Sequence, residues 1–161
     1  MSPEKAKIVS DFLCKNLENE YKTTRRVLAA LPDNQMEWQP HEKGFKAGDL
    51  AWHIVGADCF FLTGIADGAY GAPAKIERPK TVAEIVAFYD QHFPPLLERV
   101  QSLSGEQMAK PLTFAIFNNP AVIFLNLASH HSVHHRGQLS AYLRAMGAKV
   151  PSIYGPSADE K

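Results

Sequence analysis

Four of the seven histidines of this chain fall within six residues, as His130, His131, His134 and His135. His130 with His134, and His131 with His135, are spaced four residues apart, which places both imidazoles of each pair on one face of a helix. Imidazole nitrogens at this spacing are typical ligands of a divalent metal ion. A third ligand must come from elsewhere, and His53 is the candidate because it is the only other histidine within a strongly apolar run.

A helical wheel separates the two pairs. At about 100° per residue, His131 and His135 lie about 40° apart within the apolar arc of the helix, whereas His134 and His130 fall at its edge. We therefore expect His131 and His135 to face the interior, with the other two at the surface or beside the ligands. Burying an imidazole without a partner costs about 1–3 kcal/mol, and a metal ion removes that cost. The alternative is that each interior ring is hydrogen-bonded to a carbonyl or carboxylate.

Three neutral histidines with an open coordination position are typical of a catalytic metal site, since structural zinc sites close with four protein ligands. Zinc is the first expectation for the ion, although nickel and iron suit the same nitrogen set. His41 and His92 have no evident partner and are expected to face solvent.

Catalysis at such a site also needs a proton acceptor close to the nucleophile. Residues of the right type near the expected site are Glu20, Asp49, His134 and Tyr142. Polar groups near a bundle core commonly support ligands instead, so each is interpreted first as structural. Gln138 is placed to orient a ligand, and Arg136 faces away, where an ion pair or a subunit contact is expected.

Apolar residues at helical spacing predict the elements that position these residues. We expect helices from Ser2-Pro3-Glu4 to about Leu31, from about Asp49 to Ile65, from the capping box at Thr81 to Ser104, and from Pro120 to about Met146. Pro94-Pro95 should kink or split the third helix. Residues 112–117 are expected to be extended and residues 149–161 irregular. Four long helices without strand alternation predict an all-α four-helix bundle in a single domain over residues 1–161.

Composition narrows the functional class. Lys plus Arg and Asp plus Glu both number 17, so no basic excess suggests nucleic-acid binding. We expect no membrane span, since no run approaches ~18–20 apolar residues, and no signal sequence, since residues 1–5 have no apolar h-region. Cys14 and Cys59 are expected to be buried free thiols, which favours a soluble, cytoplasmic protein.

The chain resembles the DinB family in four motifs that occur in order along nearly its whole length: Glu37-Trp38-Gln39-Pro40-His41, Leu50-Ala51-Trp52-His53-Ile54, His131 to Leu139, and Pro151-Ser152-Ile153-Tyr154. The resemblance implies up-down-down-up connectivity, frequent homodimers, and a divalent metal held by His53, His131 and His135. It also implies activation of a low-molecular-weight thiol, or isomerase or hydrolase-like activity on a small molecule.

Two other functions stay open at this point. One is a non-enzymatic metal-binding dimer with a structural or stress-sensing role, and the other is a metal-free helical scaffold. The apolar faces of the first and fourth helices favour self-association in either case. The sequence leaves open the substrate, the reaction, the metal, the proton acceptor and the dimer interface.

Overall fold

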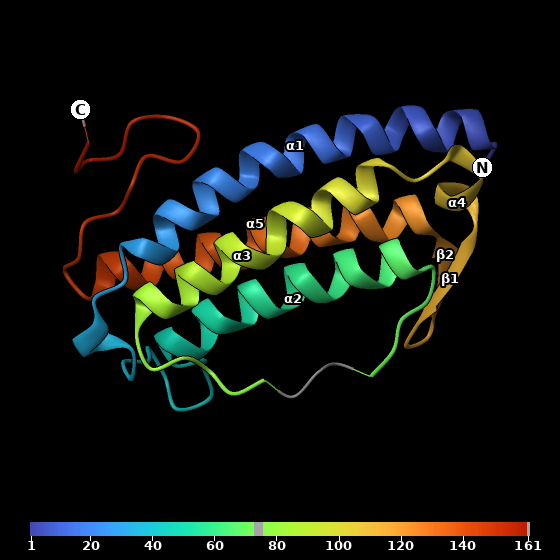
Figure 1. Ribbon diagram of the computed structural model, residues 1–161. Helices are drawn as coiled ribbons and strands as arrows, with labels where there is room; N and C mark the ends of the chain where they lie inside the picture. Colours follow the sequence, from blue (N-terminus) through green and yellow to red (C-terminus); the bar gives the residue numbers. More distant parts are fainter. Residues whose placement is uncertain (73–75, 161) are drawn as a thin grey trace.

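The computed structural model describes residues 1–72 and 76–160. Its long helices are α1 (Pro3–Ala29), α2 (Ala47–Asp67), α3 (Val82–Gln101) and α5 (Ala121–Ala145). The shorter elements are a 3-10 helix (Asp33–Gln35), α4 (Gly105–Ala109), β1 (Pro111–Phe114) and β2 (Phe117–Pro120). In Figure 1, α1 and α5 run in one direction and α2 and α3 in the other. The predicted up-down-down-up bundle is confirmed.

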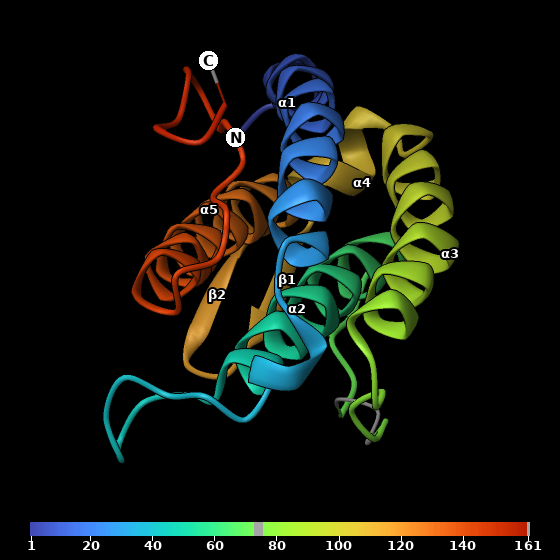
Figure 2. The same ribbon diagram turned by 90° about the vertical axis from the view of Figure 1, so that its left-hand side faces the viewer.

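Viewed along its axis, the bundle places α1 diagonally across from α2, and α3 across from α5 (Figure 2). Each long helix therefore packs against two others, and α2 and α5 share one interface while α1 and α5 share another. Fully buried side chains fill the centre, among them Leu17, Leu28, Leu50, Ile54, Tyr89, Phe93 and Phe124. The α2/α5 interface is the one that carries the candidate ligands.

The predicted helix starts are confirmed at α1 and α3. The Ser2 hydroxyl accepts a hydrogen bond from the Lys5 backbone N–H, and Pro3 opens α1. At α3 the Thr81 hydroxyl accepts from the Glu84 N–H while the Glu84 carboxylate accepts from the Thr81 N–H. Such reciprocal caps satisfy backbone donors that have no partner within the helix.

Three boundary predictions need correction. The helix α3 continues through Pro94 and Pro95, so the prolines do not split it into two pieces. Ser104 does not close that helix but caps α4. Pro120 ends β2 and occupies the cap position of α5, so the helix begins at Ala121, one residue after the predicted start. The extended segment is confirmed as a hairpin that pairs β1 with β2.

The helix α2 is long and apolar enough to cross a membrane by length and composition alone, contrary to the sequence expectation that no segment approaches this. In the bundle this helix packs against both α3 and α5. Half of its most apolar window is buried within the protein. Its apolar composition is therefore accounted for by packing and is consistent with a soluble protein.

Two residues of the predicted apolar stripes are outside the core. Val9 and Leu127 are each 39% exposed. They belong to an apolar patch near the starts of α1 and α5, which we define by its exposed members Ile8, Val9, Phe12, Ile123 and Leu127. Because α1 and α5 are adjacent and parallel, these residues lie at the same end of the bundle (Figure 1).

Candidate metal centre

The structure brings His53 of α2 together with His131 and His135 of α5. The Nε2 atoms of His53 and His131 are 3.1 Å apart, and one nitrogen from each of the three rings lies within 4.8 Å of the others. All three side chains are partly buried. Residues 78 positions apart thus converge at the α2/α5 interface. The helical wheel predicted the inward direction of His131 and His135, and the apolar run around His53 predicted the third member.

The geometry fits a shared divalent ion. With metal to nitrogen distances of about 2.05 Å, two ligands stand roughly 2.9 Å apart at a right angle and roughly 3.3 Å apart at the tetrahedral angle. The observed separation of 3.1 Å lies between these values. The Nδ1 atom of His131 is buried without a hydrogen-bond partner among the described residues.

Burial also lowers the pKa values of two of the rings. Desolvation, reinforced by the neighbouring histidines, lowers the pKa of His131 to about 4. Desolvation, with a smaller effect of His135, lowers the pKa of His53 below its ordinary value. Both rings are therefore neutral at neutral pH, which is the form that binds a metal ion.

His135 is oriented by a short hydrogen-bonded chain on α5. Its Nδ1–H donates to the Gln138 side-chain oxygen at 3.0 Å, and the Gln138 amide nitrogen donates to the Tyr142 hydroxyl at 3.1 Å. This arrangement leaves Nε2 of His135 free to face the other two rings. The predicted orienting role of Gln138 is therefore supported by its contacts, since outer partners of this kind set the tautomer of a ligand.

We expect Gln138→Leu to weaken metal affinity by about 10–100-fold, because His135 would lose the acceptor that holds its ring in place. Competition with a chromogenic chelator measures the change. Ser140→Ala, which removes a hydroxyl bonded only to the Arg136 carbonyl, is the control on the same helix. Equal affinities in the two variants would remove Gln138 from the site.

Two phenylalanines enclose the histidines. The Phe45 ring stacks on His53 at a centroid distance of 5.2 Å and meets His135 edge-on at 6.3 Å. Phe61 approaches His131 at 5.8 Å. No sequence pattern identified Phe45, which lies in the connection before α2. Its position over the site depends on how that connection folds back, which no local pattern encodes.

The remaining histidines are placed as follows. His130, His134 and His41 are exposed, as predicted. His134 is nevertheless in contact with the ligand set, since its ring lies 4.7 Å from that of His135. The prediction for His92 is wrong: its ring is partly buried and stacks on Phe88 at 3.9 Å.

The carboxylates named as proton acceptors are occupied elsewhere. Glu20 forms an ion pair with Arg136 and accepts from the Tyr154 hydroxyl. Asp49 pairs with Arg78 at 3.3 Å. The structural interpretation of both is thus supported. Arg136 makes the predicted ion pair, but its outward position is wrong, since it is only 1% exposed.

Sequence reasoning missed Asp58, which is buried in the middle of α2. Its carboxylate accepts from the Tyr89 hydroxyl at 2.6 Å and from the Ser132 hydroxyl at 3.1 Å, tying α2 to α3 and α5. Desolvation raises its pKa to about 7. An acidic residue in the middle of an apolar helix was the available signal, since such residues are rarely buried without a partner.

Because the pKa of Asp58 is raised in the folded protein, we expect the free energy of unfolding to depend on pH. Its pKa in the folded state, about 7, lies above the ordinary value of 3.8, so folding favours the protonated form. The resulting stabilisation is fully present below the unfolded value and is lost as the pH rises through about 7. Relative to Asp58→Asn, the wild type should lose up to about 1.4 kcal/mol per pH unit within this window. Urea unfolding of both proteins at several pH values measures the difference, and parallel pH profiles would contradict it.

The sequence was compared with known proteins. A sequence model of the DinB family matches residues 4–161. The protein named "Uncharacterized protein YrdA" of Bacillus subtilis (strain 168) is 29% identical over 154 residues, covering 93% of this chain and 90% of the relative. YjoA of the same strain is 24% identical over 144 residues, covering 87% and 89% of the two chains.

The fold has solved counterparts. A DinB-like protein from Bacillus cereus ATCC 10987 is similar with a TM-score of 0.77 and 25% identity, covering 88% of this chain and 95% of that one. The crystal structure of YjoA from Bacillus subtilis gives a TM-score of 0.74 at 19% identity, with 88% and 96% covered, which bears on the fold alone. With the family match spanning nearly the whole sequence, the helical bundle and its three converging histidines have a common explanation: this chain belongs to the DinB family.

Proposed function

We propose that His53, His131 and His135 bind a divalent metal, zinc in the first instance, and that the protein is a metal-dependent enzyme acting on a small molecule. The observation that carries this proposal is the convergence of three histidine nitrogens without a fourth His, Cys, Asp or Glu ligand among the described residues. A three-nitrogen face leaves coordination positions for water or substrate, which is typical of catalytic sites.

The reaction we propose is attack by water or by a low-molecular-weight thiol on an electrophile. An ion at this site would lower the pKa of the nucleophile and polarise a substrate oxygen. The protein's own contribution is positional. Phe45 covers one side of the ligand set, and the exposed His134 stands beside His135, where its imidazole is the best-placed candidate to accept the proton of the nucleophile.

The test is elemental analysis of protein purified without a His-tag, followed by turnover assays of the zinc-loaded protein. Common cellular thiols are paired with an aromatic chloro electrophile, and an activated ester serves for hydrolysis. One metal ion per chain with turnover lost in His134→Gln supports the proposal. Trace metal only would overturn the site. Full metal content without turnover of any pair would favour the non-enzymatic, structural or sensing alternative.

We place the protein in the cytoplasm. Support comes from its two cysteines, which are unpaired: Cys14 is buried and Cys59 is partly buried. Burial raises the pKa of the Cys14 thiol to about 11 and that of Cys59 to about 12, so both are unreactive. A pair of free thiols is typical of a reducing compartment.

We also propose that the chain forms a homodimer through the apolar patch on α1 and α5. Phe12, 65% exposed, is its largest side chain. We expect Phe12→Asp to weaken dimerisation by about 30-fold or more, the effect of losing an aromatic interface anchor. Light scattering during size-exclusion chromatography measures the mass. Gln101→Asp, which also adds one negative charge but lies on α3, is the control, and a wild-type monomer would contradict the proposal.

A further inference from the structure

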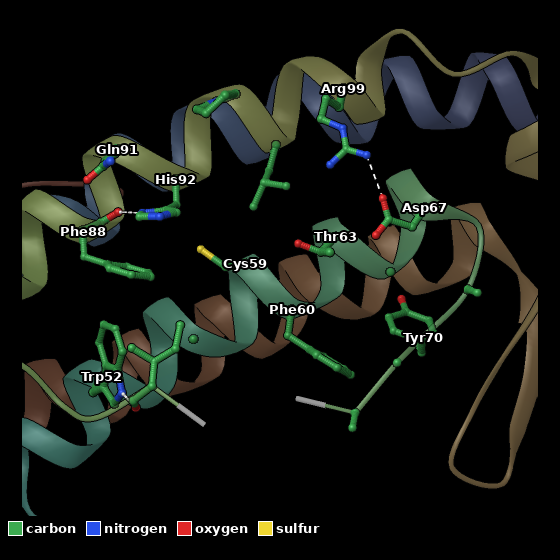
Figure 3. Close-up of a pocket in the computed structure, with 18 residues that line it drawn as sticks. Trp52, Cys59, Phe60, Thr63, Asp67, Tyr70, Phe88, Gln91, His92 and Arg99 are labelled. Atoms are coloured by element: carbon green, nitrogen blue, oxygen red, sulfur yellow. Dashed lines mark hydrogen bonds and ion pairs between the residues drawn. The ribbon is translucent and has the colours of Figure 1, made fainter. Parts of the chain in front are cut away.

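One cavity of the described structure is separate from the metal centre. It lies between α2 and α3, has a volume of about 620 Å³, and none of the three candidate ligands lines it. Figure 3 shows Trp52 and Phe88 at one end and the ion pair between Asp67 and Arg99 at the other. Pockets of this size accommodate small organic molecules.

Two glycines of α2 shape the cavity. A Cβ atom at Gly56 would meet nothing within 4 Å, so this position keeps part of the wall open. A Cβ atom at Gly64 would lie 2.1 Å from the Tyr70 ring, so the glycine lets that ring rest against the helix. A glycine inside a helix costs about 1 kcal/mol relative to alanine. Both costs fall on residues that line the same cavity.

The cavity is mainly aromatic. The Trp52 ring meets that of Phe88 edge-on at 4.9 Å, and Phe60 lies 5.3 Å from Tyr70. The Phe88 ring in turn stacks on His92. Figure 3 shows Trp52 and Phe60 on α2, Phe88 and His92 on α3, and Tyr70 on the segment that follows α2. Such walls favour a ligand that contains rings of its own.

The polar groups of the cavity carry no uncompensated charge. Arg99 donates to Asp67 at 2.7 Å, so each neutralises the other. Burial raises the pKa of the Cys59 thiol to about 12, which keeps it protonated. His92 donates its Nδ1–H to the Phe88 carbonyl at 2.8 Å, which leaves Nε2 as an acceptor. An ionised ligand would lose its hydration here without gaining a free counter-charge.

One polar group lacks a partner. The hydroxyl of Tyr70 is buried and forms no hydrogen bond within the described residues. Burial raises the pKa of this phenol, so it remains a donor at neutral pH. Leaving such a group unsatisfied costs about 1–3 kcal/mol. Because this hydroxyl is buried, it lies behind the Tyr70 ring, and only the ring itself forms part of the cavity wall.

We infer that the cavity between α2 and α3 is a second binding site, for an uncharged, ring-containing small molecule. The inference goes beyond the proposed metal chemistry and does not depend on it. Binding at this site should therefore persist in a variant that has lost the metal, such as His131→Ala.

The test uses two fluorescent probes of similar shape and different charge: neutral N-phenylnaphthylamine and anionic anilinonaphthalene sulfonate. We expect the neutral probe to bind the metal-loaded protein more tightly by about tenfold or more. Gly56→Leu should fill the cavity and weaken its binding by about tenfold or more. Gly137→Leu, which also enters open space but on α5, should leave it unchanged.

Different outcomes contradict the site and the ligand class. A wild type that does not bind the neutral probe, or equal binding by the two leucine variants, would overturn the inference. Tighter binding of the anionic probe would overturn the uncharged ligand class. Should Gly56→Leu fail to fold, nuclear Overhauser effects between the naphthyl protons and the Trp52 and Phe60 rings test the location in the unmodified protein. Their absence counts against the site.

Discussion

His131→Ala is expected to reduce metal affinity by more than about 100-fold, beyond the loss caused by removing an outer hydrogen-bond partner. His131 and His53 are the two rings whose Nε2 atoms face each other. Of the two, His131 is the one considered first. Its Nε2 is 3.1 Å from that of His53, while its Nδ1 has no partner in the described structure. Removing the His131 imidazole leaves His53 on α2 and His135 on α5 as candidate ligands. Two imidazoles bind an ion more weakly than three.

His130→Ala is the matched control. It removes an imidazole from the same helix, one position away, whose only recorded side-chain contact is with Asn126 at 3.3 Å. Zinc titration against a competing chelator, with elemental analysis of each purified variant, gives both affinity and content. We expect His130→Ala to match the wild type. A His131→Ala variant with full zinc content would refute the ligand set.

The difference between these two variants was predictable because it is local. Helical periodicity alone distinguishes His131 from His130, and the i,i+4 spacing pairs His131 with His135. The third ligand, His53, was identified from its apolar surroundings. The bundle class and the caps at Ser2 and Thr81 were equally predictable, since they too depend on short-range patterns.

What could not be predicted depends on contacts between distant segments. Phe45 covers the histidines because the connection before α2 folds back over them. The cavity between α2 and α3 is formed jointly by Gly56 and Gly64 of α2, Phe88 of α3, and Tyr70 of the segment that follows α2. Neither arrangement leaves a periodic signal in the sequence.

Arg136 shows the same limit within one helix. The wheel treated α5 as having a single apolar arc, and Arg136 fell outside it. The helix in fact packs against both α1 and α2, so Ser132 and Arg136 are buried on the side of the arc away from His134. The ligands His131 and His135 consequently lie at the edge of the buried face rather than its centre. The three candidate ligands are accordingly only partly buried.

Arg136→Met is therefore expected to destabilise the fold by about 3–5 kcal/mol, the cost of breaking a buried ion pair. Its guanidinium pairs with Glu20 and donates to the Thr24 hydroxyl at 3.3 Å and the Tyr154 hydroxyl at 2.6 Å. Methionine fills a similar volume but leaves the Glu20 carboxylate, 18% exposed, without its counter-charge.

Arg144→Met provides the control on the same helix. That side chain is 52% exposed and pairs with Asp159 at 2.7 Å, so its loss should cost less than about 1 kcal/mol. Urea unfolding of both variants gives the free energies, and unchanged m-values confirm that the same surface unfolds. Adding Glu20→Leu to Arg136→Met should recover a large part of the loss, because the unpaired carboxylate is then gone. Equal costs for the two arginines would mean that the pair with Glu20 is no more than a surface contact.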